Sequence, residues 1–528
     1  ISVIPVDALS GLQEIDLSNT RIEITNNFHT RMLAGAYAVS ENAALEYVQL
    51  VSFGCGHDAV LSDEIIRIMK EKSGKTPLIL KIDESEASGA LDIRIQSFVE
   101  TVKLRKKKES AAQQAEEPRP LPPPSPVKFY KKDKKKRTLL VPNISKEVSV
   151  ILDGILDKEN FKVRTVPVGG TKQVSLGKQY VHNDICFPCQ MVIGELISEL
   201  KEGAYDQDEV AVCMVKFQCD CRMSHYAGLL RKGLDAAGFS GVPVVTTDAG
   251  DTKDMHPGVF LLGISAVLEA VWSFMMLDIL TDLCRKIRPY EIHPGETERV
   301  YQNCVAAVAD GIRKGISDAK KAFDKCIDDM SRIPWDRSRL KNRVFVTGEL
   351  LVTYHPGSNF QIEQYLEKNG METVFPRITD QLRKDFRASA CEIRDYQANI
   401  PPYPMAVSAL FDYIQKSLEK TAARHPLYQT ALTPAQMYKN VEDIIPETLS
   451  CGEGWLMAAE IAHYAEEGVR SFVILQPFGC LPNHICGRGV IKKLKERYPD
   501  IQILPLDLDP DTSFANVENR LQMMLMNK

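Results

Sequence analysis

Several cysteines of this chain stand in turns where their sulfur atoms could bind a metal or a cluster. The chain has 528 residues, of which 13 are cysteines. Five cysteines lie in apolar or helical patterns typical of small buried residues, namely Cys213, Cys284, Cys304, Cys326 and Cys391. Others stand beside Gly or Pro or in closely spaced pairs, namely Cys55, Cys186, Cys189, Cys219, Cys221, Cys480 and Cys486. Gly54, Gly56 and Gly479 adjoin two of these cysteines and are the predicted cofactor-binding glycines, because glycine lets the backbone approach a ligand closely.

Most of the turn cysteines follow predicted strands. These strands share an apolar pattern and end shortly before the cysteine, namely 47–53 before Cys55, 210–216 before Cys219 and Cys221, and 471–475 before Cys480. Cys186 and Cys189 form a C-x-x-C pair placed before a predicted helix. Ligands of open α/β sheets bind at the carboxyl ends of strands, where strand ends and helix N-termini point N–H groups into one crevice. The loops that carry Cys55, the Cys219 and Cys221 pair, and Cys480 could therefore converge with the loop that carries Cys186 and Cys189.

Thiolates at such a site would select a soft metal. Iron–sulfur clusters, zinc and copper(I) are the partners that thiolates prefer. A cubane cluster needs about four ligands, or about three when one iron stays open. Structural zinc sites usually use paired C-x-x-C knuckles, whereas this chain has a single such pair beside a C-x-C. The spacing alone leaves an iron–sulfur cluster, zinc and no metal open.

The elements that must position these residues are predicted to alternate between strands and helices. Further short strands are expected at 78–82, 138–141, 163–166, 242–246, 344–347 and 501–506, with helices between most of them. Helical patterns dominate 265–332, apart from a break at Arg288-Pro289-Tyr290. This order predicts an α/β fold of two or three doubly wound, mostly parallel-sheet domains with extra helices, and a cluster in the inter-domain crevice.

Changes in composition divide the chain into four predicted segments. They are an α/β unit with the Gly54 turn at 1–101, a charged, proline-rich linker at 102–137, an α/β domain with a helical extension at 138–340, and a C-terminal α/β domain with the Cys480 turn at 341–528. The basic run at 131–137 is interpreted as part of the solvated linker.

The composition favours a cytoplasmic protein. The chain is 44% hydrophobic and 26% charged, without a long apolar run or a signal-peptide pattern. Its net charge of −5 gives no chain-wide field that would attract nucleic acid or an anionic membrane. We therefore expect neither a nucleic-acid partner nor a membrane partner.

Two other motifs compete with the metal hypothesis. The turn Gly54-Cys55-Gly56, followed by Ala59, fits the Gly-x-Gly-x-x-Ala pattern of a dinucleotide fold, but a cysteine between the glycines is unusual where the backbone must press against pyrophosphate. The acidic residues from Asp507 to Glu518 mimic a calcium loop, yet Thr512 stands where the loop needs glycine. A nucleotide-binding α/β enzyme that uses the Gly54 turn remains an alternative function.

Five longer stretches resemble one protein family over most of the chain. They are 48–59, 80–84, 183–188, 452–456 and 476–489, of which the last, beginning Gln476-Pro477-Phe478-Gly479-Cys480, is the most specific. They resemble the large CoA-enzyme activase-related proteins, relatives of the 2-hydroxyacyl-CoA dehydratases and of the double-cubane cluster proteins. The similarity lies in the region that follows the ATPase domains of that family.

The resemblance implies an iron–sulfur electron acceptor. An ATP-hydrolysing activase, either a separate chain or domains that precede Ile1, would deliver low-potential electrons, and this chain would act as a reductase or a 2-hydroxyacyl-CoA dehydratase-like enzyme. The substrate would be a small molecule, with a CoA ester as one option, and a homodimer is one option for the assembly. The cluster ligands carried over by motif are Cys55, Cys186, Cys221 and Cys480. A non-catalytic electron-relay or scaffold subunit is the alternative.

The chain also differs from the family pattern in ways that affect the cluster. Cys189, Cys219 and Cys486 are additional thiols near the ligand positions, so the cofactor is expected to be either a [4Fe-4S] cluster or a double-cubane [8Fe-9S] cluster. A reduction also needs protons, which a histidine or carboxyl group near the open iron would supply. His484 is the first predicted proton donor and Glu349, at another strand end, is the second.

Overall fold

The structure is a computed structural model that falls into two compact units. It describes residues 2–22, 24, 26–52, 57–82, 88–112, 127–182, 184–216, 221–246, 263–397 and 403–526. Unit 1 comprises Ile1–Phe129, Lys178–Ile185 and Met214–Val259, and unit 2 comprises Tyr130–Gly177, Cys186–Cys213 and Phe260–Lys528. No helix among the described ranges is both long enough and apolar enough to cross a membrane.

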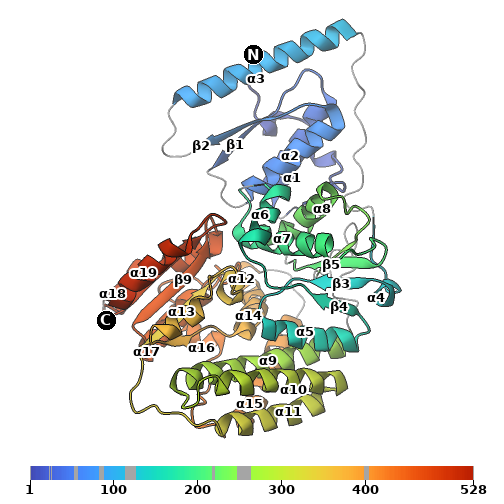
Figure 1. Cartoon of the computed structure of the whole chain (residues 1–528). Coiled ribbons are helices and arrows are strands. Elements are labelled where there is room, and N and C mark those ends of the chain that lie inside the picture. The colour runs from blue at the N-terminus through green and yellow to red at the C-terminus, as the bar shows by residue number, and fades with distance from the viewer. Residues whose placement is uncertain are drawn as a thin grey trace. The chain divides into compact units, whose positions relative to one another are not determined.

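Unit 1 contains the strand, helix, strand motif predicted near its N-terminus. Parallel strands β1 (Val48–Ser52) and β2 (Leu78–Ile82) are joined through α2 (Asp58–Ser73). Helix α1 (Asn27–Glu41) packs against α2 (Figure 1). The remaining longer elements of the unit are α3 (Ser88–Ala112), α8 (Tyr226–Ala236) and β6 (Val244–Thr246). Helix α3 continues past residue 101, where the sequence predicts the linker to begin.

Unit 2 confirms the predicted α/β class with parallel sheets. One set of strands has the order β4-β3-β5, and a second sheet has the order β10-β9-β7-β8. Their bounds are β3 (Thr138–Val141), β4 (Lys162–Thr165), β5 (Val210–Met214), β7 (Arg343–Gly348), β8 (Glu372–Val374), β9 (Ser471–Pro477) and β10 (Gln502–Leu508). In the second sheet the chain adds β8 on one side of β7 and then β9 on the other. The junction of β7 and β9 is therefore a topological switch point, which is where ligands bind in such sheets.

Glycine is required where β7 meets β9. Gly348 pairs with Leu475, and its φ of +147° lies in a region that favours glycine. A Cβ atom at this position would lie 1.8 Å from the carbonyl oxygen of Leu475. The absence of a side chain thus lets the two strands stay paired up to the point where α12 begins.

Helices surround the two sheets of unit 2. Those of the first half are α4 (Asp133–Lys136), α5 (Lys146–Lys158), α6 (Thr171–Tyr180), α7 (Phe187–Glu202), α9 (Ile264–Ile287), α10 (Glu296–Lys314) and α11 (Ile316–Ser331). The C-terminal half contains α12 (Leu350–Tyr354), α13 (Ile362–Lys368), α14 (Ile378–Tyr396), α15 (Tyr403–Ala422), α16 (Pro434–Tyr438), α17 (Leu456–Glu466), α18 (Ile491–Arg497) and α19 (Phe514–Met526). A short π-helical segment, η6 (Asn483–Arg488), follows β9.

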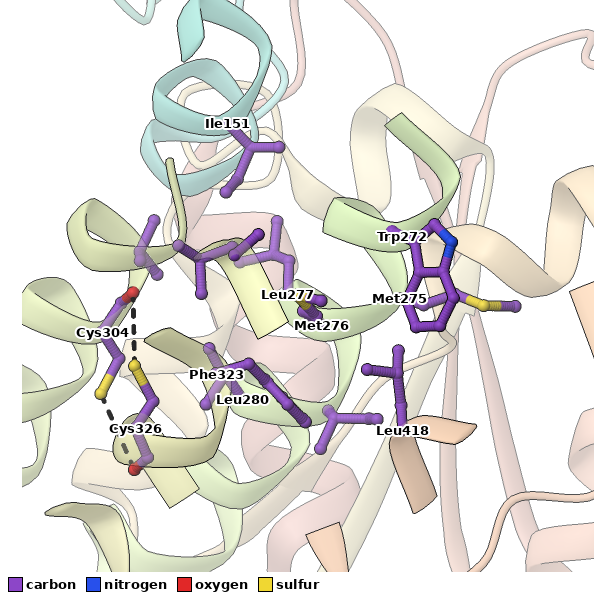
Figure 2. Close-up of a cluster of buried hydrophobic side chains, with 14 of the residues drawn as sticks. Ile151, Trp272, Met275, Met276, Leu277, Leu280, Cys304, Phe323, Cys326 and Leu418 are labelled. Atoms are coloured by element: carbon purple, nitrogen blue, oxygen red, sulfur yellow. Dashed lines mark hydrogen bonds between the residues drawn. The ribbon is translucent and has the colours of Figure 1, made fainter. Parts of the chain in front are cut away.

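A hydrophobic core joins α5, α9, α10, α11 and α15, which pack together in Figure 1. Figure 2 shows two thiols of this core facing each other. Cys304 donates to the carbonyl of Cys326 over 3.9 Å, and Cys326 donates to the carbonyl of Cys304 over 3.6 Å. Cys284 and Cys391 are also buried, as the sequence predicts, whereas Cys213 is half-buried.

A buried hydrogen bond fixes α7 against the segment that follows α12. His355 Nε2 lies 2.9 Å from Glu195 Oε1, and neither side chain is exposed by more than 1%. The backbone N–H of Ser358 donates to His355 Nδ1 over 3.0 Å, so Nδ1 is an acceptor and Nε2 carries the hydrogen that Glu195 accepts. Gly169 N donates to the same carboxyl oxygen over 2.6 Å.

Two local features differ from the sequence-based expectations. The three-residue strand β8 was not predicted, because its residues Glu372 and Thr373 are polar although both are buried. Within the basic run, Lys134 and Arg137 are buried rather than solvated. Arg137 donates to the carbonyls of Gln207 and Val210, over 2.7 and 3.0 Å, which anchors the start of β3.

Candidate functional site

Two predicted site residues stand at the switch point of the C-terminal sheet. Glu349 directly follows β7, and Cys480 follows β9 by three residues. The backbone N–H of Glu349 donates to the carbonyl of Leu475 in β9 over 3.0 Å. This hydrogen bond joins the carboxyl ends of β7 and β9, which the turns of Glu349 and Cys480 follow.

Glu349 is a half-buried N-cap. Its carboxyl oxygen accepts a hydrogen bond from the N–H of Val352 over 2.9 Å, in the first turn of α12. Loss of solvent contact, together with charge repulsion from the neighbouring Glu453, raises the pKa of this carboxyl group to about 8. Glu349 is therefore an acid that can keep its proton at neutral pH.

Glu453 is a second carboxyl group at this place, and the sequence did not predict it as a site residue. Its Oε1 accepts from the N–H of Leu350 over 2.8 Å, in the same turn of α12 that Glu349 caps. Burial raises its pKa as well. The flanking Gly452 and Gly454 have φ values of +56° and +53°, so a Gly-Glu-Gly triplet was the signal that could have revealed a special loop.

A buried lysine holds the loop that carries Glu453. The ammonium group of Lys384 donates to the carbonyls of Ser450 and Gly452. Gln381 donates to the carbonyl of Gly452 over 2.7 Å. A Cβ atom at Gly452 would lie 2.9 Å from Cγ of Pro482, so this loop packs closely on the turn after β9.

Asn483 connects Glu453 with the predicted cysteine ligand. Its Nδ2 donates to Glu453 Oε2 over 3.0 Å and to Cys480 Sγ over 3.4 Å. Asn483 is fully buried, and its Oδ1 has no hydrogen-bond partner among the described residues. A buried amide oxygen without a partner is an unmet acceptor that points to an additional group at this site.

The turn before Cys480 has the geometry that its glycine predicts. Gly479 has a φ of +68°, a conformation that side-chain-bearing residues rarely adopt. The N–H of Cys480 donates to the carbonyl of Pro477 over 3.0 Å, which closes the turn. Cys480 is 8% exposed, so this residue is nearly but not completely buried.

His484 lies on the other side of the same turn, beside an acidic residue of β10. Its Nε2 lies 3.8 Å from Asp507 Oδ1. Asp507 also accepts from the side chain of Gln476 and, over 3.1 Å, from Arg488. The structure therefore associates His484 with Asp507 rather than with Glu349 and Glu453.

The other predicted ligands lie in both units. Cys186 is the N-cap of α7, and Cys189 lies inside the first turn of that helix rather than before it. Cys486 lies in η6, where its Sγ is 3.8 Å from the carbonyl oxygen of Leu449 and burial raises the pKa of the thiol to about 11. Cys221, in unit 1, is half-buried. The remaining predicted residues lie outside the described ranges, namely Cys55, Cys219, Gly54 and Gly56.

Histidines also cluster in unit 1. His57 Nδ1 and His225 Nε2 are 2.8 Å apart, and the ring of His29 lies 4.7 Å from that of His57 between centroids. Burial, reinforced by the neighbouring histidines and Lys216, holds the pKa of His225 well below its ordinary value. No local pattern in the sequence indicates that the rings of His57 and His225 meet.

No group of three or more His, Cys, Asp or Glu side chains in the described ranges has the arrangement of a metal site. The predicted convergence of the turn cysteines stays a prediction, since two of them lie outside those ranges. Comparison with known proteins adds no assignment: no model of a protein family matches the chain, and a search of curated proteins finds no match either.

Proposed function

We propose that this chain is an iron–sulfur protein that accepts low-potential electrons from an ATP-hydrolysing activase and uses them to reduce or dehydrate a small substrate. The observation that carries the proposal is the meeting of a thiol and two half-buried acids at one switch point. Cys480 follows β9, Glu349 follows β7, and Asn483 links Cys480 to Glu453. Electron and proton delivery would thus come from the sheet edge at which α/β proteins bind ligands.

The donor atoms present suit an iron–sulfur cluster in their chemistry. The described cysteines offer soft thiols, and an N–H donor on sulfur, as Asn483 provides for Cys480, is one of the features that tune such clusters. Cys480 and Cys486 would hold the group from one segment, with Cys186 and Cys189 as further candidates. An iron–sulfur cluster, when bound, supplies single electrons at low potential.

The half-buried acids Glu349 and Glu453 favour an enzyme over a simple electron relay. A relay needs cluster ligands but no proton donor, whereas reduction of a small molecule consumes protons. Glu349 keeps its proton at neutral pH because burial and Glu453 raise its pKa to about 8. His484, beside Asp507, is the second candidate for this role.

The proposal is tested by ATP-dependent reduction of the anaerobically purified chain. With an activase of the related family, ATP and a strong reductant, we expect the visible cluster absorbance to bleach only when ATP is present. Addition of a 2-hydroxyacyl-CoA ester as the first probe substrate should then form the unsaturated ester and water without restoring the colour, because this dehydration is redox-neutral. Bleaching that does not depend on ATP, or no visible absorbance at all, would contradict the proposal. Bleaching without turnover of any small substrate would identify a relay.

A further inference from the structure

Two carboxyl groups share the first turn of α12. Glu453 accepts from the N–H of Leu350 over 2.8 Å, and Glu349 accepts from the N–H of Val352 over 2.9 Å. These N–H groups are two residues apart on one helical turn, so both carboxyl groups lie against it. Two ionised carboxylates side by side on one half-buried turn would repel each other. One proton between them removes that repulsion.

We infer that Glu349 and Glu453 form a carboxyl pair that holds a single proton and supplies it to the substrate at the Cys480 turn. The inference rests on the proposed function for the identity of the reaction. It assigns to Glu453 a role as the partner that keeps Glu349 protonated.

The surroundings distinguish the two members of the pair. Glu453 receives hydrogen bonds from Leu350 N, from Asn483 Nδ2 and from its own backbone N–H, whereas Glu349 receives them from the backbone N–H groups of Val352 and Leu351. Donors on a carboxylate stabilise its ionised form. Glu453 is therefore the ionised member and Glu349 is the member that holds the proton.

Other charged and titratable groups around the pair agree with this assignment. From α14, the ammonium group of Lys384 acts to lower the pKa of Glu453. From α17, burial raises the pKa of Glu460 well above its ordinary value. The negative charge that acts on Glu349 thus comes from Glu453.

A second observation at the site points to a bound molecule. Asn483 Oδ1 is fully buried and has no partner among the described residues, although the Nδ2 of the same amide bonds Glu453 and Cys480. An unmet acceptor beside a proton donor suits a ligand that carries an O–H group. The chemical class inferred is a small hydroxylated or carbonyl compound whose reduction takes up a proton.

The proton balance of the step is simple. A substrate that accepts one electron from the reduced iron–sulfur protein takes one proton from Glu349. The O–H bond of the Glu349 carboxyl group breaks, and a C–H or O–H bond forms on the substrate. Glu349 is left as a carboxylate, and it regains a proton from solvent after product leaves.

The pair can be tested by infrared titration of the full chain, which reports protonated carboxyl groups without any turnover. In the wild type, we expect a protonated-carboxyl band that disappears as the pH rises through the pKa of Glu349. Glu349→Gln should remove this band. Glu453→Gln should leave the band but move its midpoint to lower pH by about one unit or more, because the repelling charge is gone. Glu460→Gln is the matched control and should leave the midpoint unchanged.

An unchanged midpoint in Glu453→Gln would overturn the pair, and an infrared titration curve of Glu349→Gln identical to that of the wild type would overturn the position of the proton, since Glu460 and Asp278 also contribute protonated-carboxyl absorbance. If a variant does not fold, carbon NMR of the wild-type chain with labelled glutamate still tests the pair. The carboxyl signals of a coupled pair titrate in two separate steps. In turnover, Glu349→Gln should lower kcat without raising KM and without changing iron content. If the chain lacks iron but shows the coupled titration, the proposed function is wrong and the inference of the carboxyl pair stands.

Discussion

Asn483 donates a hydrogen bond from Nδ2 to Cys480 Sγ over 3.4 Å, and the same nitrogen donates to Glu453 Oε2 over 3.0 Å. This amide therefore joins the turn after β9 to the loop that carries Glu453. Both contacts are buried, so their loss is not compensated by water.

Replacement of Asn483 should weaken the fold and change the sulfur environment. Asn483→Ala leaves Glu453 without one of its donors, and we expect a loss of about 1–3 kcal/mol in unfolding free energy, measured by urea denaturation. Asn440→Ala is the control, because Asn440 donates to Glu466 on the surface over 3.1 Å and should cost less than about 0.5 kcal/mol. Equal effects of the two variants would argue against a structural role for the Asn483 contacts.

Glu349 should make stability depend on pH in a defined direction. Its folded-state pKa of about 8 is above its ordinary value of 4.5, so the folded chain binds the proton more tightly than the unfolded chain. This contribution is fully present below about pH 4.5 and is lost as the pH rises to about 8, with a slope of at most ~1.4 kcal/mol per pH unit. Glu349→Gln should flatten the curve in that window.

The control for this prediction separates Glu349 from other titrating groups. Burial raises the pKa of Asp278 to about 7, so Asp278 gives stability a similar dependence on pH. This dependence is the same in the wild type and in Glu349→Gln. The difference between wild type and Glu349→Gln therefore isolates Glu349. A constant difference from acid to alkaline pH would show that Glu349 does not titrate in this range.

The buried hydrogen bond between His355 and Glu195 should contribute measurably to stability. Glu195→Gln leaves His355 Nε2 with a weaker acceptor in a buried place, and we expect a loss of about 1–3 kcal/mol in unfolding free energy. The exposed pair of Arg332 and Asp329 is the control, and Asp329→Asn should change stability by less than about 1 kcal/mol. Similar losses in both variants would contradict the importance of the buried pair.

Gly348 should be intolerant of any side chain. In Gly348→Ala the new Cβ would lie 1.8 Å from the carbonyl oxygen of Leu475, so β7 and β9 must separate, at a cost of several kcal/mol, on the order of the largest single-site effects. Gly370→Ala is the matched control, because Gly370 also has positive φ, +78°, but its Cβ would meet nothing within 4 Å. We expect about 1 kcal/mol there. Comparable melting temperatures for the two variants would exclude the steric account.

Much of the fold follows from apolar runs in the sequence. Strands such as β2 and β3 were predicted at their exact bounds because each is a continuous apolar or β-branched segment, and the break at Arg288 is the short 3-10 turn that interrupts the helical region. Strand β8 escaped notice because Glu372 is satisfied by tertiary contacts, from Tyr290 and Arg337, that no local pattern reveals.

The candidate site was only partly predictable, for a similar reason. Glu349 and Cys480 could be placed because both follow recognisable strands. Glu453 comes from a loop about a hundred residues after Glu349, and its role depends on the fold of α12 against that loop. The link between Glu195 and His355 joins segments 160 residues apart and has no local signal at all.

Metal content tests the central claim most directly. Iron and acid-labile sulfide should be measured in anaerobically purified wild type, in Cys480→Ser, and in Cys451→Ser as a control that is not a predicted ligand. We predict about four irons per wild-type chain for one cubane, or about eight for a double cubane, with a clear loss in Cys480→Ser and none in Cys451→Ser. Wild-type protein without iron, or unchanged iron in Cys480→Ser, would contradict the account.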